Sequence, residues 1–408
     1  MVQSLDWGKQ NKSHQKPQSR KGNTKTVSRR PTPFLLIALL LVLLMILVAC
    51  ALIWIYADRG GDSVQTARIV RQDESLKGFS IQAPLAHQYY PFNNEYVLRV
   101  TSDYVSYVDE DQNTAFSFRV DLSEPEVIVN GGYALIYDRD ALNYYLFNGD
   151  GLHLYGQGSS AIQGAQVNRN GSFLLIMQDR SSRGILRVMD SSGRHRFDRE
   201  FFDMENSGFL INAAFTPEGD AVDISMVNTD GMEADAVLLR ISLEDYTTMW
   251  HYRIDEISSL PLLLHDSDGL LYSSDGTTIW QISEYGPALW HTIPDAQDMK
   301  PSEEGIWVLD DNGHTLYLLP WTSPGTALRS SMIETLELAN SVKAWHPLGN
   351  RALIHQTDGQ LKILSSYNTE NVELLSVPVN GLLQIQWVED KDLSIVTERQ
   401  VLWLDLEE

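Results

Sequence analysis

Short hydrophobic segments separated by polar turns run along most of the chain, from about residue 68 to the C-terminus; Tyr133–Tyr137, Ser172–Met177 and Leu238–Ile241 are typical. Asn-Gly and Asp-Gly pairs stand between many segments and supply the positive φ angles that tight hairpin turns need. No amphipathic stretch of helical length lies among them. The pattern predicts an all-β chain. The pairs begin at Asn130, Asn148, Asp150, Asn170, Asp230, Asp268, Asp275, Asn312 and Asp358.

Two sequence phrases recur at a spacing that fits one repeating unit. In the first, Trp250, His251 and Asp255 return forty residues later as Trp290, His291 and Asp295. The second is a strand followed by a turn, and it ends at Gly171, Gly219 and Gly349, which are 48 and 130 residues apart. Repeats of about 40–50 residues with four short strands each are typical of β-propeller blades.

The repeats divide the chain into eight candidate blades, and a seven-bladed ring is the alternative because the first unit is weak. The last unit is short by about one strand, which either Thr66–Val70 or Phe79–Gln82 can supply. Such a strand closes the ring and protects sheet edges. The units begin near Phe92, Glu126, Ala161, Phe209, Ile257, Asp298, Asn340 and Asn380.

Phe34–Ala57 is a run of 24 residues without a charge, long enough to span about 36 Å as a helix and so to cross a bilayer. Residues 1–33 hold eight basic residues and one acidic residue, which places them in the cytoplasm by the positive-inside rule. We therefore expect four parts: a disordered basic cytoplasmic tail (1–33), a transmembrane signal anchor (34–57), a juxtamembrane linker that can include the closing strand (58–78) and an extracytoplasmic propeller (79–408) in a bacterial cell membrane.

Cys50 is the single cysteine, so a disulfide framework and a multi-cysteine zinc site are excluded. It ends the sequence Leu47-Val48-Ala49-Cys50, which resembles a bacterial lipobox. Lipidation of Cys50 is thus an alternative to the uncleaved anchor. Either arrangement leaves the large domain outside the cell and tethered to the membrane.

The charge of the chain is strongly acidic beyond its N-terminal tail. Of 31 basic and 54 acidic residues, 23 and 53 follow residue 33, which gives that part a formal charge of −30. Nucleic-acid binding needs clustered Lys and Arg, so the composition argues against such a partner. Partners that are neutral, cationic or locally complementary are expected instead.

The repeats resemble the diverged propellers related to quinoprotein-like and WD-type repeats. Trp250 and Trp290, placed in the last strand of a blade, resemble the quinoprotein-like pattern, and Phe215–Gly219 resembles the strand-and-turn phrase of WD-like and Tol-type propellers. The order of basic tail, single span and diverged propeller resembles a bacterial family known as domain of unknown function 5711. That resemblance implies a membrane-anchored propeller and carries no established activity.

Several motifs with a chemical alternative are better explained as turns or packing. Asp109–Asn113 alternates ligands as a calcium loop does, but it lacks the glycine at the sixth position, and Val120 stands where the bidentate glutamate belongs. Asp310–Gly313 is similar and shorter. Asp275-Gly276 resembles the Asp-box of sialidase-like propellers but reads as a hairpin turn. His251 and His291 are expected in neighbouring blades, where a shared metal site is the alternative to a packing role. No catalytic residue, metal site or cofactor is predicted.

Tryptophans crowd the last third of the chain, and most are expected to pack between blades. Trp321 lies in a Pro- and Gly-containing segment that reads as a loop, so it is the predicted interaction residue. The sequence favours a non-enzymatic, membrane-tethered scaffold that binds a protein or cell-envelope partner. The alternative is a small-ligand or cation sensor, or a carbohydrate-active enzyme, that uses the central channel.

Overall fold

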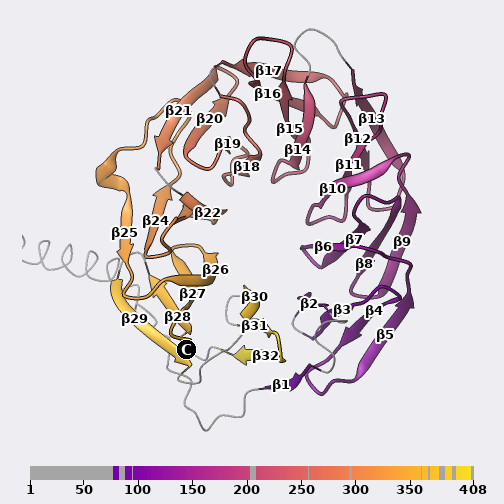
Figure 1. Ribbon diagram of the computed structural model, residues 1–408, viewed down its shortest axis with the longest axis vertical. Coiled ribbons are helices and arrows are strands. Elements are labelled where there is room, and N and C mark those ends of the chain that lie inside the picture. The colour runs from indigo at the N-terminus through magenta and orange to yellow at the C-terminus, as the bar shows by residue number, and fades with distance from the viewer. Residues whose placement is uncertain are drawn as a thin grey trace, which may run out of the picture. The chain divides into compact units, whose positions relative to one another are not determined.

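The computed structural model describes residues 77–81, 88–93, 95–202, 208–255, 257–293, 296–359, 361–365, 368–375, 382–387 and 392–405. Within these ranges lie strands β1–β32 and one short 3₁₀ helix, η1 (Ser330–Met332). The strands form eight antiparallel sheets of four strands each, which stand around a ring (Figure 1). The prediction of an all-β propeller is confirmed, with eight blades rather than seven.

The blades follow the chain in order, and we number them from the first complete one. Blade 1 contains β2 (Gln88–Pro91), β3 (Val97–Val100), β4 (Tyr104–Val108) and β5 (Thr114–Arg119). Blade 2 contains β6 (Pro125–Asn130), β7 (Tyr133–Asp138), β8 (Asn143–Asn148) and β9 (Gly151–Gln157). Blade 3 contains β10 (Ala161–Val167), β11 (Phe173–Gln178), β12 (Gly184–Met189) and β13 (His195–Phe201). Blade 4 contains β14 (Phe209–Phe215), β15 (Ala221–Asn228), β16 (Asp235–Ser242) and β17 (Thr248–Ile254).

The second half of the ring repeats this arrangement. Blade 5 contains β18 (Leu262–His265), β19 (Leu271–Ser274), β20 (Thr278–Ser283) and β21 (Gly286–Thr292). Blade 6 contains β22 (Ala296–Pro301), β23 (Gly305–Asp310), β24 (Thr315–Pro320) and β25 (Glu334–Glu337). Blade 7 contains β26 (Val342–Leu348), β27 (Arg351–Gln356), β28 (Leu361–Ser365) and β29 (Asn368–Leu375). Blade 8 contains β30 (Leu382–Trp387), β31 (Asp392–Thr397) and β32 (Gln400–Asp405), joined by β1 (Lys77–Ser80).

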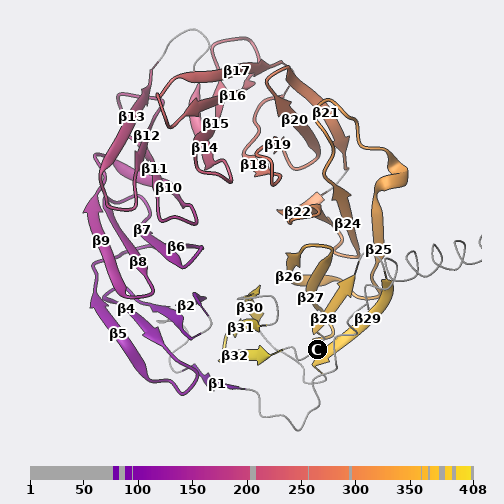
Figure 2. The same cartoon turned by 180° about the vertical axis from the view of Figure 1, so that it is seen from behind.

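In each of blades 1–7 the first strand faces the centre of the ring and the fourth lies at its rim, as both views show (Figure 2). Seven of the eight predicted blade starts lie within four residues of an observed first strand, and the eighth, Ile257, precedes Leu262 by five. Trp250 and Trp290 occupy β17 and β21, the fourth strands of blades 4 and 5, as the repeat predicted.

Ring closure joins the two ends of the propeller within blade 8. There β1 pairs with β32 in antiparallel register, with Phe79 opposite Val401. The Phe79 ring lies 5.7 Å from that of Tyr89 in blade 1 and 6.0 Å from that of Trp403 in blade 8. Of the two predicted closing segments, the one that contains Phe79 is thus confirmed, and the strand begins two residues earlier, at Lys77. Thr66–Val70 lies outside the described residues.

The turn between the first two strands carries the second repeated phrase. In blade 3 the side-chain oxygen of Asn168 accepts the backbone N–H groups of Asn170 and Ser172, and Gly171 takes a φ of +82°. In blade 4 the Thr216 hydroxyl bonds the backbone of Ala221 across the same turn. In both blades the polar turn residue satisfies backbone groups that the strands leave unpaired.

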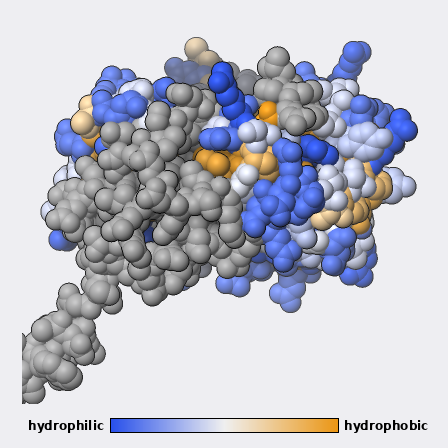
Figure 3. Space-filling model, turned by 90° about the horizontal axis from the view of Figure 1, so that it is seen from below, coloured by the Kyte–Doolittle hydropathy of each residue, from blue (hydrophilic) through white to orange (hydrophobic). Residues whose placement is uncertain are grey.

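Apolar faces of neighbouring blades pack against each other to form the core. Trp307 of blade 6 is fully buried and donates its indole N–H to the carbonyl of Gly349 in blade 7, at 2.9 Å. Trp345 of blade 7 is buried in the same cluster, as predicted for these tryptophans. By contrast, the coloured residues on the face in Figure 3 are mainly hydrophilic, with small hydrophobic patches between them.

The predicted membrane span (34–57) and the alternative lipidation site, Cys50, lie outside the described residues. Within the part of the chain that the structure does describe, no helix has the length and apolar character needed to cross a membrane.

Substitution of Gly78 by alanine is expected to weaken ring closure. Gly78 has a φ of +146°, and a Cβ atom there would overlap the carbonyl oxygen of Val401 on β32. Backbone strain costs about 1–3 kcal/mol. The clash adds to this cost because the Val401 carbonyl is part of the backbone of β32, the strand that pairs with β1. We expect the denaturation midpoint of Gly78→Ala to fall by more than that of Gly276→Ala, whose φ is +101° with no atom within 4 Å. Equal shifts for the two variants would show that β1 does not hold the ring.

Candidate functional site

A cavity of about 560 Å³ opens between blades 4, 5 and 6, and we call it the interblade pocket. The turns β18–β19 and β20–β21 border it, so it lies at the end of the blades where first strands meet second strands. Three blades contribute its walls. Its lining comprises Arg240, Met249 and Trp250 of blade 4, residues 266–270 and 282–285 of blade 5, and residues 321–324 of blade 6.

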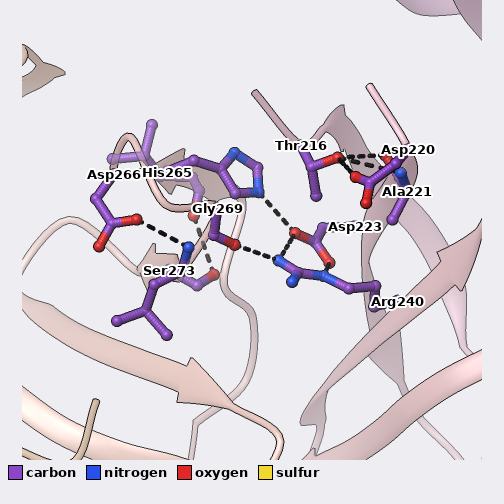
Figure 4. A network of polar contacts seen from close by, with 11 residues as sticks. Thr216, Asp220, Ala221, Asp223, Arg240, His265, Asp266, Gly269 and Ser273 are labelled. Carbon is purple, nitrogen blue, oxygen red and sulfur yellow. Dashed lines mark hydrogen bonds and ion pairs between the residues drawn. The ribbon is translucent and has the colours of Figure 1, made fainter. Parts of the chain in front are cut away.

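The wall from blade 4 is built on a buried ion pair. The Arg240 guanidinium donates to both carboxylate oxygens of Asp223, at 2.7 and 2.6 Å, and to the carbonyl of Gly269 at 2.9 Å (Figure 4). Asp223 is fully buried, and its Oδ2 lies 2.6 Å from Nε2 of His265 in blade 5. This network ties blade 4 to blade 5 and neutralises Arg240, the one cation among the described lining residues. The guanidinium carbon also lies 5.3 Å from the ring centre of Trp250.

The base of the pocket is the β18–β19 turn, in which Asp266 holds the same place as Asn168 in blade 3. Asp266 Oδ1 accepts the backbone N–H groups of Asp268 and Leu270, at 3.0 and 2.9 Å, and Gly269 takes a φ of +80°. The residue is only 8% exposed, and burial raises the pKa of its carboxyl group. Its other oxygen, Oδ2, makes no hydrogen bond to a described residue. Asp266 is therefore a desolvated carboxylate with one oxygen left for a ligand.

The wall from blade 6 contains Trp321, the predicted interaction residue. Trp321 follows β24 in a loop, as expected, but it is half-buried rather than freely exposed. Its indole N–H donates to the carbonyl of Ser302 at 3.0 Å, and its ring lies 4.8 Å from that of Tyr272 in blade 5. Trp321 thus lines a formed pocket instead of projecting from a flexible tip.

Thr322 fixes this loop against blade 5. Its hydroxyl accepts the indole N–H of Trp290 at 2.7 Å and donates to the carbonyl of Thr326 at 2.9 Å. Its carbonyl accepts the hydroxyl of Tyr272, whose pKa is raised by burial. Gln281 adds a bond from the backbone N–H of Gly325 to its side-chain oxygen at 2.7 Å. The repeat tryptophan Trp290 therefore positions a loop of the next blade in addition to filling the core.

The rim of the pocket carries exposed apolar and acidic side chains. Tyr285 is 86% exposed and Met249 is 58% exposed. A hydrogen bond to Glu284 raises the pKa of Tyr285. Asp268 is exposed on the facing turn. Large apolar side chains surrounded by carboxylates are characteristic of an interaction surface, because aromatic anchors are often central to protein interfaces.

The other sequence motifs are found in turns. Asp109 Oδ1 accepts the backbone N–H groups of Asp111 and Asn113 between β4 and β5. Asp275 does the same for Thr277 and Thr278 between β19 and β20, and Asp310 for His314 and Thr315 between β23 and β24. These carboxylates satisfy backbone donors, as the turn interpretation predicted. Throughout the described ranges, no group of three or more His, Cys, Asp or Glu side chains is placed to hold a metal ion.

His251 and His291 lie on β17 and β21, so the prediction that they occupy neighbouring blades is confirmed. His251 is exposed, whereas His291 is half-buried and burial lowers its pKa. Among the described first strands, the carboxylates are Glu126 of blade 2, which pairs with Arg139 at 2.8 Å, and Asp298 of blade 6, which pairs with Lys300 at 3.3 Å. They come from opposite blades and do not converge.

The sequence interpretation missed Asp266, Tyr285 and the Arg240–Asp223 pair. A signal for Asp266 was present, because Asp266 stands three residues before Gly269 as Asn168 stands three before Gly171. Aligning the repeats on these glycines would have placed Asp266 at the turn. It would not have shown that strands β16 and β17 of blade 4 and the loop after β24 of blade 6 line the same pocket.

Replacing Trp290 with phenylalanine is expected to destabilise the propeller by about 1–3 kcal/mol, because the change removes the donor to the buried Thr322 hydroxyl. Trp250→Phe is the matched control, since Trp250 holds the same repeat position without a hydrogen bond from its indole N–H to any described residue. Chemical denaturation of both variants measures the difference. A loss for Trp250→Phe as large as for Trp290→Phe would contradict this role.

Comparison with known proteins supports the fold and leaves the activity open. The sequence matches no curated protein. Among solved structures, Sqt1 of Saccharomyces cerevisiae aligns with a TM-score of 0.55 at 10% identity over 82% of this chain and 100% of its own. The computationally designed protein Ika8 gives 0.51 at 12% over 81% and 98%. BamB from Moraxella catarrhalis gives 0.49 at 11% over 81% and 99%. At these identities the first two likenesses show the fold alone. Residues 67–247 match the profile of a family of unknown function, DUF5711.

Proposed function

We propose that this protein is a non-enzymatic scaffold at the bacterial cell envelope, anchored in the membrane by residues 34–57, and that it binds a protein partner through the interblade pocket. The observation that carries the proposal is the convergence of Trp250, Tyr285 and Trp321, from three different blades, on one cavity of about 560 Å³. A cavity of this size accommodates a few side chains of a partner.

The pocket is held in one shape before any partner arrives. The Arg240–Asp223–His265 network and the bonds to Thr322 join its three walls. A preorganised site loses little conformational entropy on binding, so its aromatic contacts contribute to affinity without first ordering the loops. A scaffold that must hold a partner at the membrane benefits from this rigidity.

The membrane anchor and the external location are part of the proposal. They are supported by the uncharged length of residues 34–57 and by the basic character of residues 1–33, from which the positive-inside rule places the propeller outside. The alternative function, a cation or sugar site in the central channel, has weaker support because Glu126 and Asp298 are each paired with a cation in separate blades.

A photo-crosslinking amino acid at position 285 is expected to trap a partner in intact membranes. Tyr285 suits this test because it is 86% exposed at the pocket rim, so the substitution leaves the core intact. Tyr155, which is 70% exposed on β9 of blade 2, is the matched control. We expect one reproducible adduct from position 285 that is absent from position 155, and we expect it to weaken at least about tenfold in a background with Trp321→Ala. Identical adducts from both positions would rule out the pocket as the docking site.

Cysteine labelling tests the predicted topology. With Cys50→Ala as background, one cysteine is introduced at Tyr155 in the propeller or at Ser13 in the tail. An impermeant maleimide added to spheroplasts is expected to label the cysteine at position 155 and to label the one at position 13 only after lysis. The reverse pattern would contradict the orientation. Loss of Cys50→Ala from the membrane fraction would favour lipidation over the anchor helix.

A further inference from the structure

Asp266 is a buried carboxylate that the turn uses only in part. We propose that the interblade pocket takes the cationic side chain of a lysine or arginine from a partner polypeptide, and that Asp266 Oδ2 is the group that anchors the cation. This inference rests on the proposed function and specifies the chemistry of the partner segment.

The charge of the lining favours a cation. Among the described lining residues, three are acidic, namely Asp266, Asp268 and Glu284, and one is basic, Arg240. The charge of Arg240 is already balanced by its ion pair with Asp223, which is buried and is not among the residues that line the pocket. The pocket therefore attracts cationic groups and repels anionic ones.

The position of Asp266 makes it the strongest of the three acceptors. It is 8% exposed, whereas Asp268 and Glu284 are exposed on the rim, and one of its oxygens is free of bonds to described residues. In Figure 4 the bonded oxygen of Asp266 points to the turn, and the other points away from it. A hydrogen bond between a cation and a carboxylate is stronger in a site shielded from water, because the local dielectric is lower.

The aromatic walls suit the rest of such a side chain. Trp250 already lies within cation–π distance of the Arg240 guanidinium, and Lys300 lies 4.5 Å from the ring centre of Trp345 in blade 7. Aromatic rings and Met249 can pack along the apolar stem of a lysine or arginine while its charged end reaches Asp266. A norleucine side chain would fit the same walls but would leave the carboxylate without its partner.

The repeat itself supplies a variant that removes the charge and keeps the turn. Asn168 makes, in blade 3, the same two backbone bonds that Asp266 makes in blade 5. Asp266→Asn should therefore retain the β18–β19 turn. Asp310→Asn is the matched control, because Asp310 also caps a turn through Oδ1 and lies at the opposite end of blade 6, away from the pocket.

The probe is a set of four bead-bound heptapeptide pools with randomised flanks and lysine, arginine, norleucine or glutamate at the centre. Fluorescently labelled full-length protein in detergent is incubated with each pool. We expect the lysine and arginine pools to retain about ten times more protein than the norleucine pool, which corresponds to about 1.4 kcal/mol. Asp266→Asn should abolish this preference, and Asp310→Asn should preserve it.

Three results would overturn the inference: equal retention by the norleucine or glutamate pool, equal loss in Asp266→Asn and Asp310→Asn, or full competition by millimolar spermidine or calcium, which would indicate a small-cation site. If Asp266→Asn does not fold, equal retention of the unchanged protein by the lysine and norleucine pools still refutes the inference. A crosslink at position 285 without a preference for cationic pools would refute this inference alone, whereas absence of the crosslink would refute the proposed function.

Discussion

The burial of one blade by the next is the constraint on which the whole structure depends. A four-stranded sheet with two apolar faces cannot keep them both from water unless a neighbour covers each side. In this chain the cover is specific: Trp307 of blade 6 reaches the backbone of Gly349 in blade 7, and Phe79 packs between blades 1 and 8. Because every blade needs two neighbours, the ring must close, and closure places an N-terminal strand beside the last strand of the chain. The pocket forms because blades 4, 5 and 6 must pack side by side to bury their apolar faces.

Repetition of the blade also explains how a turn position that serves the fold can provide a charged group for a ligand. The turn between the first two strands needs a short polar side chain to accept backbone N–H groups, and Asn168, Thr216 and Asp266 each meet that need. Asparagine and threonine do so without a charge. Aspartate at the same place carries a charge and leaves a second oxygen, and in blade 5 it lies in a pocket lined by residues of two other blades as well. Asp266 thus keeps the turn and adds a charged acceptor to the pocket lining.

Features that depend on short stretches of sequence could be predicted. The Asn-Gly and Asp-Gly turns, the Trp250 and Trp290 repeat and the closing strand at Phe79 each follow from local patterns, and the eight blade starts follow from their spacing. The pocket could not be found this way, because its residues lie 84 positions apart, from Arg240 to Pro324, and meet only once three blades stand side by side. Trp321 was identified only from the loop-like sequence around it, so its half-buried position and its contact with Tyr272 could not be predicted.

The contacts of Trp290 connect the local sequence repeat with the pocket that three blades form. As a repeat residue it fills the core of blade 5, where it lies 4.7 Å from Tyr272. As a donor it holds Thr322, and through Thr322 the segment that carries Trp321. Any movement of the Trp321 loop must therefore break a buried hydrogen bond or disturb a core tryptophan, and both cost free energy. The loop is consequently tied to the core of the blade that supports it. A partner meets a pocket whose aromatic wall is set by the packing of the propeller, so the stability of the ring and the affinity of the site depend on the same residue.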